Sequence, residues 1–152
     1  MGQFVIGFQT SEFIPPEKGA ENYSIDSIKL TLITPGEPSF QYDSTYDLFE
    51  TYTGEDLDEG RPIELHGAGF RNDYIGEDFL SRNTPSFSGG LRTVFPLSWD
   101  PEGNDLDVSG NVGLQVESRP WAIGKIAGPE EGAYVNEEME MIFDVDLSDP
   151  NV

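Results

Sequence analysis

The chain has 152 residues, and its 29 Asp and Glu against 8 Lys and Arg give a formal net charge of −21 at pH 7. This charge repels phosphate backbones and anionic lipid headgroups, which argues against nucleic acid and the membrane surface as partners. The chain has no Cys and a single His, so disulfides, thiol nucleophiles and multi-histidine zinc sites are excluded. Its 18 aromatic residues (10 Phe, 6 Tyr and 2 Trp) are more than a disordered acidic chain carries, so we expect a folded domain.

Short apolar runs separated by Gly and Pro turns recur along the first half of the chain. We expect strands at residues 3–8, 23–34, 39–42 and 62–70. The run at 23–34 is a good example, because Ile28, Leu30 and Leu32 alternate with polar residues. Residues 42–59 carry regularly spaced aromatics that fit one face of a helix or an aromatic-rich loop, and we favour the loop.

The second half continues the same pattern. We expect strands at residues 91–97, 112–116, 121–123 and 138–147, a short helix near 77–80 and a polar turn region at 98–111. The last strand is the clearest: Met139, Met141, Phe143, Val145 and Leu147 recur at period two, which predicts one buried face on a central strand. These features predict an all-β fold, a β-sandwich or jelly roll with long loops and little helix, formed as one domain by residues 1–152.

The first residues do not combine a basic segment with a long apolar run, so the sequence predicts neither a signal peptide nor a membrane span. The chain opens directly in an expected strand and stops soon after another. We therefore expect it to be a segment of a longer, secreted protein, with an extracellular or cell-surface location.

Four segments in the middle of the chain have sequences similar to those of known extracellular modules. They are YDSTYD at 42–47, DEGRPIELHGAGFRN at 58–72, DVSGNV at 107–112 and RPWAIG at 119–124. They resemble a module of large secreted bacterial proteins of the planctomycete type. The segment SIKLTL at 27–32 is similar to the start of DNRLRE-type extracellular β-sandwich modules, although the motif that names those modules is absent. The resemblance implies an extracellular β-sandwich and no catalytic residues.

Catalytic chemistry has few candidate residues in this sequence. There is no Gly-x-Ser-x-Gly nucleophile elbow, and any catalytic triad would have to use His66, the chain's one imidazole. We interpret His66 as a half-exposed structural residue. A pair of carboxylates could still hydrolyse glycans, but an acid-rich chain brings such pairs together by chance.

No cofactor is required, and calcium is the one cofactor for which the sequence offers candidate ligands. Oxygen-bearing side chains alternate along a turn-forming stretch and could bind a hard cation: Asp100, Glu102, Asn104, Asp105 and Asp107. The alternative, which we favour, is a solvated hairpin connection built from good turn formers. A second acidic loop at Glu55, Asp56, Asp58 and Glu59 admits the same two interpretations.

Sugar binding would require exposed aromatic rings that stack on pyranose faces. The candidates are Trp99, Tyr46, Tyr52 and Tyr74, with Trp121 assigned to the core because it alternates with Ile123. Taken together, the sequence predicts a non-enzymatic binding or spacer module. Its expected partners are neighbouring domains of a larger protein or a glycan. The alternatives are a carbohydrate-binding module and a small carboxylate-dependent glycan hydrolase.

Overall fold

The computed structural model of the chain describes residues 6–7, 14, 18–47, 59–71, 94–100, 102–108, 120–149 and 152. Contacts between residues divide the chain into two compact units. One comprises residues 1–26 and 70–95, and the other comprises residues 27–69 and 96–152. The expectation of a single domain stays a prediction.

The described residues form an all-β structure with a single 3-10 turn, as the sequence predicted. The elements in chain order are η1 (Ala20–Asn22), β1 (Ile28–Ile33), β2 (Phe40–Gln41), β3 (Glu64–Leu65), β4 (Gly67–Phe70), β5 (Val94–Trp99), β6 (Asp105–Asp107), β7 (Ala122–Ile123), β8 (Lys125–Ile126), β9 (Tyr134–Val135) and β10 (Glu140–Val145). They make several small antiparallel sheets. The arrangement of these sheets as a sandwich or jelly roll stays a prediction.

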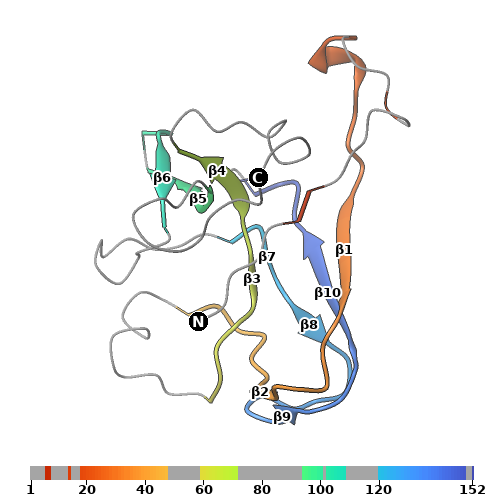
Figure 1. Ribbon diagram of the computed structural model, residues 1–152. Helices are drawn as coiled ribbons and strands as arrows, with labels where there is room; N and C mark the ends of the chain where they lie inside the picture. Colours follow the sequence, from red (N-terminus) through yellow and green to blue (C-terminus); the bar gives the residue numbers. More distant parts are fainter. Residues whose placement is uncertain are drawn as a thin grey trace. The chain divides into compact units, whose positions relative to one another are not determined.

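The six-residue strands β1 and β10 belong to the sheet β1-β10-β8, in which β10 is central (Figure 1). The antiparallel register places Leu30 opposite Phe143 and Leu32 opposite Met141. Because side chains alternate between the two faces of a strand, this register gathers the apolar residues of both strands on one face. The expected central position of the last strand is confirmed within this sheet.

Burial along β10 follows the predicted alternation, except at one end. Met141, Phe143 and Val145 are buried, with Phe143 only 2% exposed, and Met139 is half-buried. The predicted burial of Leu147 is wrong, because this side chain is 38% exposed. The strand ends at Val145, and Asp146 accepts hydrogen bonds from the Ser148 backbone and hydroxyl, which turns the chain away from the sheet.

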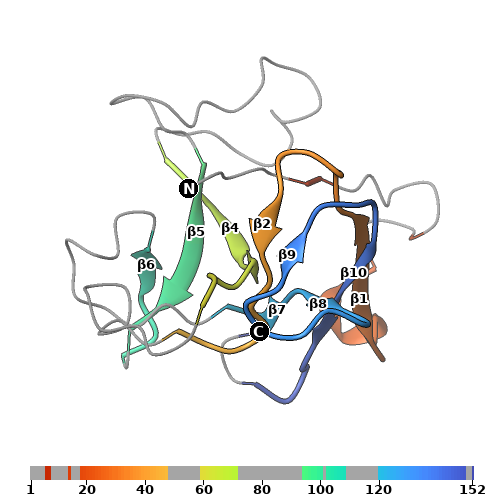
Figure 2. The same cartoon turned by 90° about the horizontal axis from the view of Figure 1, so that it is seen from below.

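Two pairs of short strands accompany this sheet. β2 pairs with β9, which places Phe40 opposite Val135, and β3 pairs with β7. Figure 2 shows β2 and β9 side by side. The buried core cluster consists of Tyr42, Ile126, Val135, Met141 and Phe143. Half-buried apolar residues pack against it, among them Leu65 on β3 and Ile63 just before that strand.

The remaining sheet has the order β4-β5-β6. β5 and β6 are antiparallel neighbours, with Trp99 opposite Asp105 and Leu97 opposite Asp107. β6 lies inside the region 98–111 that the sequence predicted to be a polar turn, so that boundary was wrong. In the unit formed by residues 1–26 and 70–95, the Arg71 guanidinium carbon lies 4.6 Å from the centre of the Phe95 ring, a cation–π distance.

Several predicted elements differ from the observed ones in extent. β1 begins at Ile28 rather than at residue 23, and the strand expected at 62–70 is interrupted at His66 between β3 and β4. Residues 42–47 form no helix, in agreement with the loop interpretation of that stretch. The strand expected at 112–116 and the helix expected at 77–80 lie outside the described residues, as does the strand at 3–8 apart from residues 6–7.

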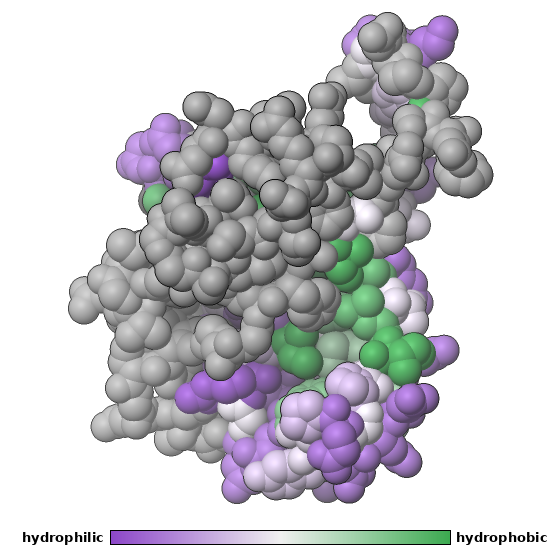
Figure 3. Space-filling model, in the orientation of Figure 1, coloured by the Kyte–Doolittle hydropathy of each residue, from purple (hydrophilic) through white to green (hydrophobic). Residues whose placement is uncertain are grey.

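The described part of the surface separates into apolar and hydrophilic areas. Figure 3 shows hydrophobic side chains gathered in one area and bordered by hydrophilic ones. On β1 the outward residues Lys29 and Thr31 are exposed, whereas Leu30 and Leu32 between them are half-buried. The outer face of the strand is therefore polar at Lys29 and Thr31, as its alternating sequence predicted, and apolar at Ile33, which is 61% exposed.

Candidate functional site

The turn between β5 and β6 contains the residues that the sequence proposed for calcium. Asp100 closes this turn: its Oδ1 accepts a hydrogen bond from the Asn104 backbone at 2.7 Å, and its Oδ2 accepts one from Asn104 Nδ2 at 2.8 Å. The backbones of the same two residues are joined by a 3.0 Å bond from Asp100 N–H to Asn104 C=O. The bonds that the carboxylate accepts from Asn104 lower the pKa of Asp100 below its ordinary value, with the Asn104 side chain as the main cause.

The other members of this predicted set continue from the turn. Glu102 is exposed in the turn, and Asp105 and Asp107 lie at the two ends of β6. Across the described residues, the structure shows no group of three or more acidic or histidine side chains placed to hold one metal ion. The hydrogen bonds of Asp100 show that the turn interpretation has a structural basis, and calcium binding at this loop stays a prediction.

The aromatic residues considered for sugar binding fall in different parts of the chain. Trp99 is half-buried at the end of β5, and Tyr46 is 38% exposed in the segment after β2. Trp121 is half-buried and packs close to Gly67, where a Cβ atom would lie 2.7 Å from the indole Cζ2. Tyr52 and Tyr74 lie outside the described residues, as do Glu55, Asp56 and Asp58 of the second acidic loop.

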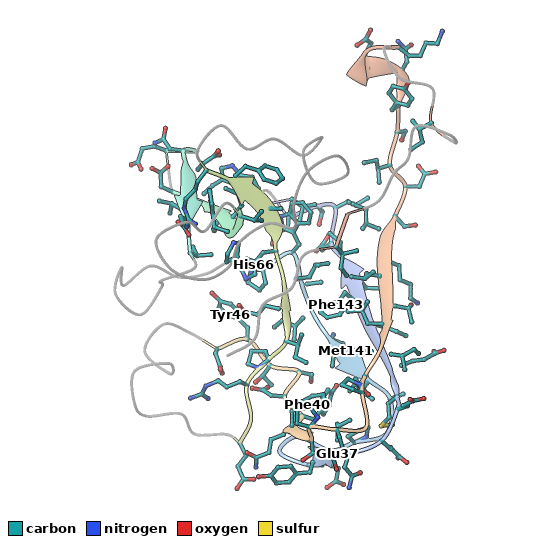
Figure 4. The ribbon with its side chains drawn as sticks, in the orientation of Figure 1. Glu37, Phe40, Tyr46, His66, Met141 and Phe143 are labelled. Atoms are coloured by element: carbon teal, nitrogen blue, oxygen red, sulfur yellow. The ribbon has the colours of Figure 1, made fainter. Side chains whose placement is uncertain are left out.

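His66 lies between β3 and β4, at the point where the strand is interrupted (Figure 4). Its side chain is only 10% exposed, less than the half-exposure expected from the sequence. The Nε2 atom lies 3.0 Å from Glu64 Oε2, two residues earlier in the chain. The Nδ1 atom is buried and has no hydrogen-bond partner within the described ranges. His66 is therefore packed into the structure and oriented by Glu64.

Two buried carboxylates that the sequence did not single out lie in the segment that follows β2. Asp43 and Asp47 are the only buried acidic residues in the described part of the chain, with Asp43 3% exposed. Asp43 Oδ1 accepts hydrogen bonds from the backbone and the hydroxyl of Thr45, at 2.8 and 2.7 Å. Asp47 Oδ2 lies 3.6 Å from Arg61 Nη1.

Segments distant in sequence contact the residues on either side of Asp43. The Ser44 backbone and hydroxyl donate to the carboxylate of Glu131, and Gln41 Nε2 donates to Glu59 Oε2 at 3.2 Å. Residues 41–47 therefore lie against both residues 59–61 and residues 130–133. We call Asp43, Asp47, Glu59 and Glu131 the acidic cluster.

Only part of the acidic cluster has a visible sequence signal. Asp43 is followed by Ser and Thr, and an Asp that accepts bonds from the residue two positions later is a common local turn motif. Burial of Asp43 and Asp47 has no such signal, because it depends on the distant residues 59–61. The local sequence around these two acids is that of a solvated loop.

No family model, curated protein or solved structure matches this chain. Within the described residues, no helix is both long enough and apolar enough to cross a membrane.

Proposed function

We propose that the chain is a non-enzymatic β-sandwich module that serves as a binding or spacer unit of a larger extracellular or cell-surface protein. Its partners on this proposal are neighbouring domains or a glycan. The support is the combination of a sheet with an apolar core, a strongly acidic composition and the packing of the single imidazole.

The state of His66 carries the non-enzymatic part of the proposal. A general base must reach the proton that it removes, within about 3 Å or through one water. The Nε2 atom of His66 is held by Glu64, and its Nδ1 atom is buried. This arrangement suits a packed structural side chain better than a catalytic base.

Calcium binding at the β5–β6 turn is a second part of the proposal. The turn presents Asp100, Glu102 and Asp105 on a short connection, and Asp100 already holds the turn closed through Asn104. Calcium would add stability only if it binds the folded turn more tightly than the unfolded chain. A calcium-dependent rise in melting temperature that is lost in Asp100→Ala and Asp107→Ala would support this site. An equal rise with sodium chloride at matched ionic strength would reduce it to charge screening.

The second candidate function is carbohydrate binding, which the partial exposure of Trp99 and Tyr46 favours. A glycan array probed with the wild-type protein and with Trp99→Ala and Tyr46→Ala tests it. Binding of one glycan class that is lost in Trp99→Ala would replace the spacer assignment with a carbohydrate-binding one. Binding that is retained in both variants would exclude these two rings as the sugar platform.

The non-enzymatic assignment is tested by screening the wild-type protein against a broad set of glycan and ester substrates. We expect no turnover above a heat-denatured sample. Saturable turnover by the folded protein would overturn the assignment and favour the hydrolase alternative.

A further inference from the structure

We propose that the outer edge of β1 pairs with the same edge of a second copy of this chain. The two β1 strands run antiparallel about a two-fold axis at Thr31, and the sheets β1-β10-β8 of the two copies join into one. The inference does not depend on the proposed function. It follows from the unpaired backbone groups of β1, the incomplete burial of its apolar side chains and the complementarity of its sequence to itself.

The first observation is that β1 is paired along one edge. Its neighbour in the sheet is β10, and no strand lies on its other side among the described residues (Figure 1). The antiparallel register runs without a break from Ile28 to Ile33. In the same register, the Thr34 backbone N–H donates to the Met139 carbonyl oxygen at 2.8 Å. Because bonded pairs recur at every second residue of an antiparallel ladder, the even-numbered residues of β1 direct their backbone groups toward β10.

The odd-numbered residues of β1 therefore direct their backbone N–H and C=O groups away from β10. They are Lys29, Thr31 and Ile33, and within the described part of the chain no hydrogen bond reaches these outward groups. All three residues are exposed. A row of unpaired donors and acceptors along a sheet edge is a template on which a further strand can pair.

The second observation is the incomplete burial of the core face of β1. Leu30 and Leu32 are half-buried, although the residues opposite them on β10, Phe143 and Met141, are only 2% and 3% exposed. A side chain on an edge strand has a neighbouring strand on one side, whereas a side chain on a central strand has one on each side. An added strand with apolar residues opposite Leu30 and Leu32 would remove more of their surface from water.

The third observation is that β1 itself has the sequence that this edge requires. When Thr31 lies opposite Thr31 of the second copy, Leu30 lies opposite Leu32 of that copy, and Leu32 lies opposite its Leu30. On the outer face, a pair of Thr side chains is a favourable cross-strand pair. Odd-numbered residues then pair with odd-numbered residues, which keeps the core faces of both sheets on one side, as a two-fold axis perpendicular to the sheet requires. Each copy uses the same edge, so this contact closes at two copies.

The charge of this edge also suits a second copy. Residues 27–36 contain no acidic residue, and Lys29 is their one charged residue, in a chain of net charge −21. In the register centred on Thr31, Lys29 lies opposite Ile33 of the second copy, whose side chain the aliphatic stem of the lysine can cover. The acids elsewhere in the two copies repel one another at longer range. Salt screens this repulsion, because the Debye length falls from about 10 Å at 0.1 M to about 3 Å at 1 M.

The test is sedimentation equilibrium of the 152-residue chain over a concentration series, at low and at high sodium chloride. We expect a monomer–dimer equilibrium whose dissociation constant falls as the salt concentration rises. A protein that stays monomeric up to millimolar concentration at both salt concentrations would overturn the proposal.

A pair of variants that change the net charge equally shows whether β1 forms the contact. Thr31→Lys places two positive charges opposite each other at the two-fold axis, and Glu130→Gln removes a negative charge at an exposed position between β8 and β9. We expect the dissociation constant to rise at least about tenfold in Thr31→Lys, because juxtaposed like charges weaken an interface, and not to rise in Glu130→Gln. Long-range repulsion alone would instead strengthen the dimer in both variants. A dimer that Thr31→Lys does not weaken would overturn the proposal.

Amide hydrogen exchange of the wild-type protein, followed by NMR, tests the edge without a variant. We expect the Thr31 and Ile33 amides to exchange rapidly in a dilute sample and to become protected where the dimer forms. The Leu30 and Leu32 amides, which face β10, should be protected in both samples. Protection of Thr31 and Ile33 in the dilute monomer would overturn the proposal, because another part of the chain would then occupy the edge. Rapid exchange at these two amides in the dimer would also overturn it, because the copies would then meet elsewhere.

Discussion

The hydroxyl oxygen of Tyr42 accepts a hydrogen bond from the backbone N–H of Ile126, at 3.1 Å. Both residues are buried in the core cluster, and they are far apart in the sequence. The bond connects the segment that follows β2 with strand β8. It gives the buried N–H of Ile126 its acceptor and the buried Tyr42 hydroxyl a partner, as buried polar groups require.

Removal of this hydroxyl should destabilise the protein. Tyr42→Phe keeps the ring but leaves the Ile126 N–H without its acceptor, which should lower the free energy of unfolding by about 1–3 kcal/mol. Urea denaturation followed by tryptophan fluorescence measures the change. Tyr134→Phe is the matched control, because Tyr134 is exposed, and it should unfold like the wild-type protein. Equal stability of the two variants would show that the buried bond contributes nothing.

The alternating burial of β10 predicts unequal effects along the strand. Phe143→Ala should cost about 3–5 kcal/mol, because a fully buried ring leaves a cavity in the core. Leu147→Ala, beyond the end of the strand, should change stability by no more than about 0.5 kcal/mol, as is usual for surface positions. Thermal unfolding of the two variants gives this comparison. A cost at position 147 that matches the cost at 143 would contradict the observed end of β10.

Gly124 allows the core side chains of β10 to approach the backbone between β7 and β8. A Cβ atom at this position would lie 2.5 Å from Met141 Sδ and 2.9 Å from Phe143 Cζ. Gly124→Ala should therefore destabilise the protein by about 1–3 kcal/mol through overpacking. At Gly36 the nearest atom to a Cβ would be 3.5 Å away, an ordinary contact, so Gly36→Ala should be tolerated. Denaturant unfolding of the two variants measures the difference. An equal decrease of the unfolding midpoint in both variants would argue against tight packing at Gly124.

The lowered pKa of Asp100 predicts a dependence on pH. Because its folded-state pKa lies below its ordinary value of 3.8, ionised Asp100 contributes stability above that value. This contribution is lost as the pH falls through the folded pKa. Asn104→Ala removes the main cause of the shift, so the Asp100 pKa measured by carboxyl NMR should rise toward its ordinary value. An unchanged pKa in this variant would show that Asn104 does not stabilise the carboxylate.

The fold was predictable where local alternation and long-range pairing agree. Phe143 and Met141 recur at period two on β10, and the strand is central in its sheet, as predicted. The short strands β6, β8 and β9 were missed because two or three residues carry no periodic signal, and they are strands only because partners such as β2 and β10 lie beside them. Leu147 was misassigned because its pattern continues past the turn that Asp146 begins.

In the candidate sites, too, features with a local sequence signal were predictable and features that depend on distant residues were not. The turn at Asp100 was predictable because its hydrogen bonds join residues four positions apart in a stretch rich in turn formers. The burial of Asp43 was not predictable, because Gly60 and the residues near Glu131 approach it from distant parts of the chain. A single sequence contains no local signal for such an approach.

The most direct test of the non-enzymatic assignment compares stability and turnover in His66→Gln. If His66 is a packed structural residue oriented by Glu64, the variant should unfold more easily, by about 1–3 kcal/mol. Neither the variant nor the wild-type protein should turn over any glycan or ester substrate. Two results together would contradict the account. The wild-type protein would turn over a substrate and His66→Gln would not, while the two proteins would have the same unfolding midpoint.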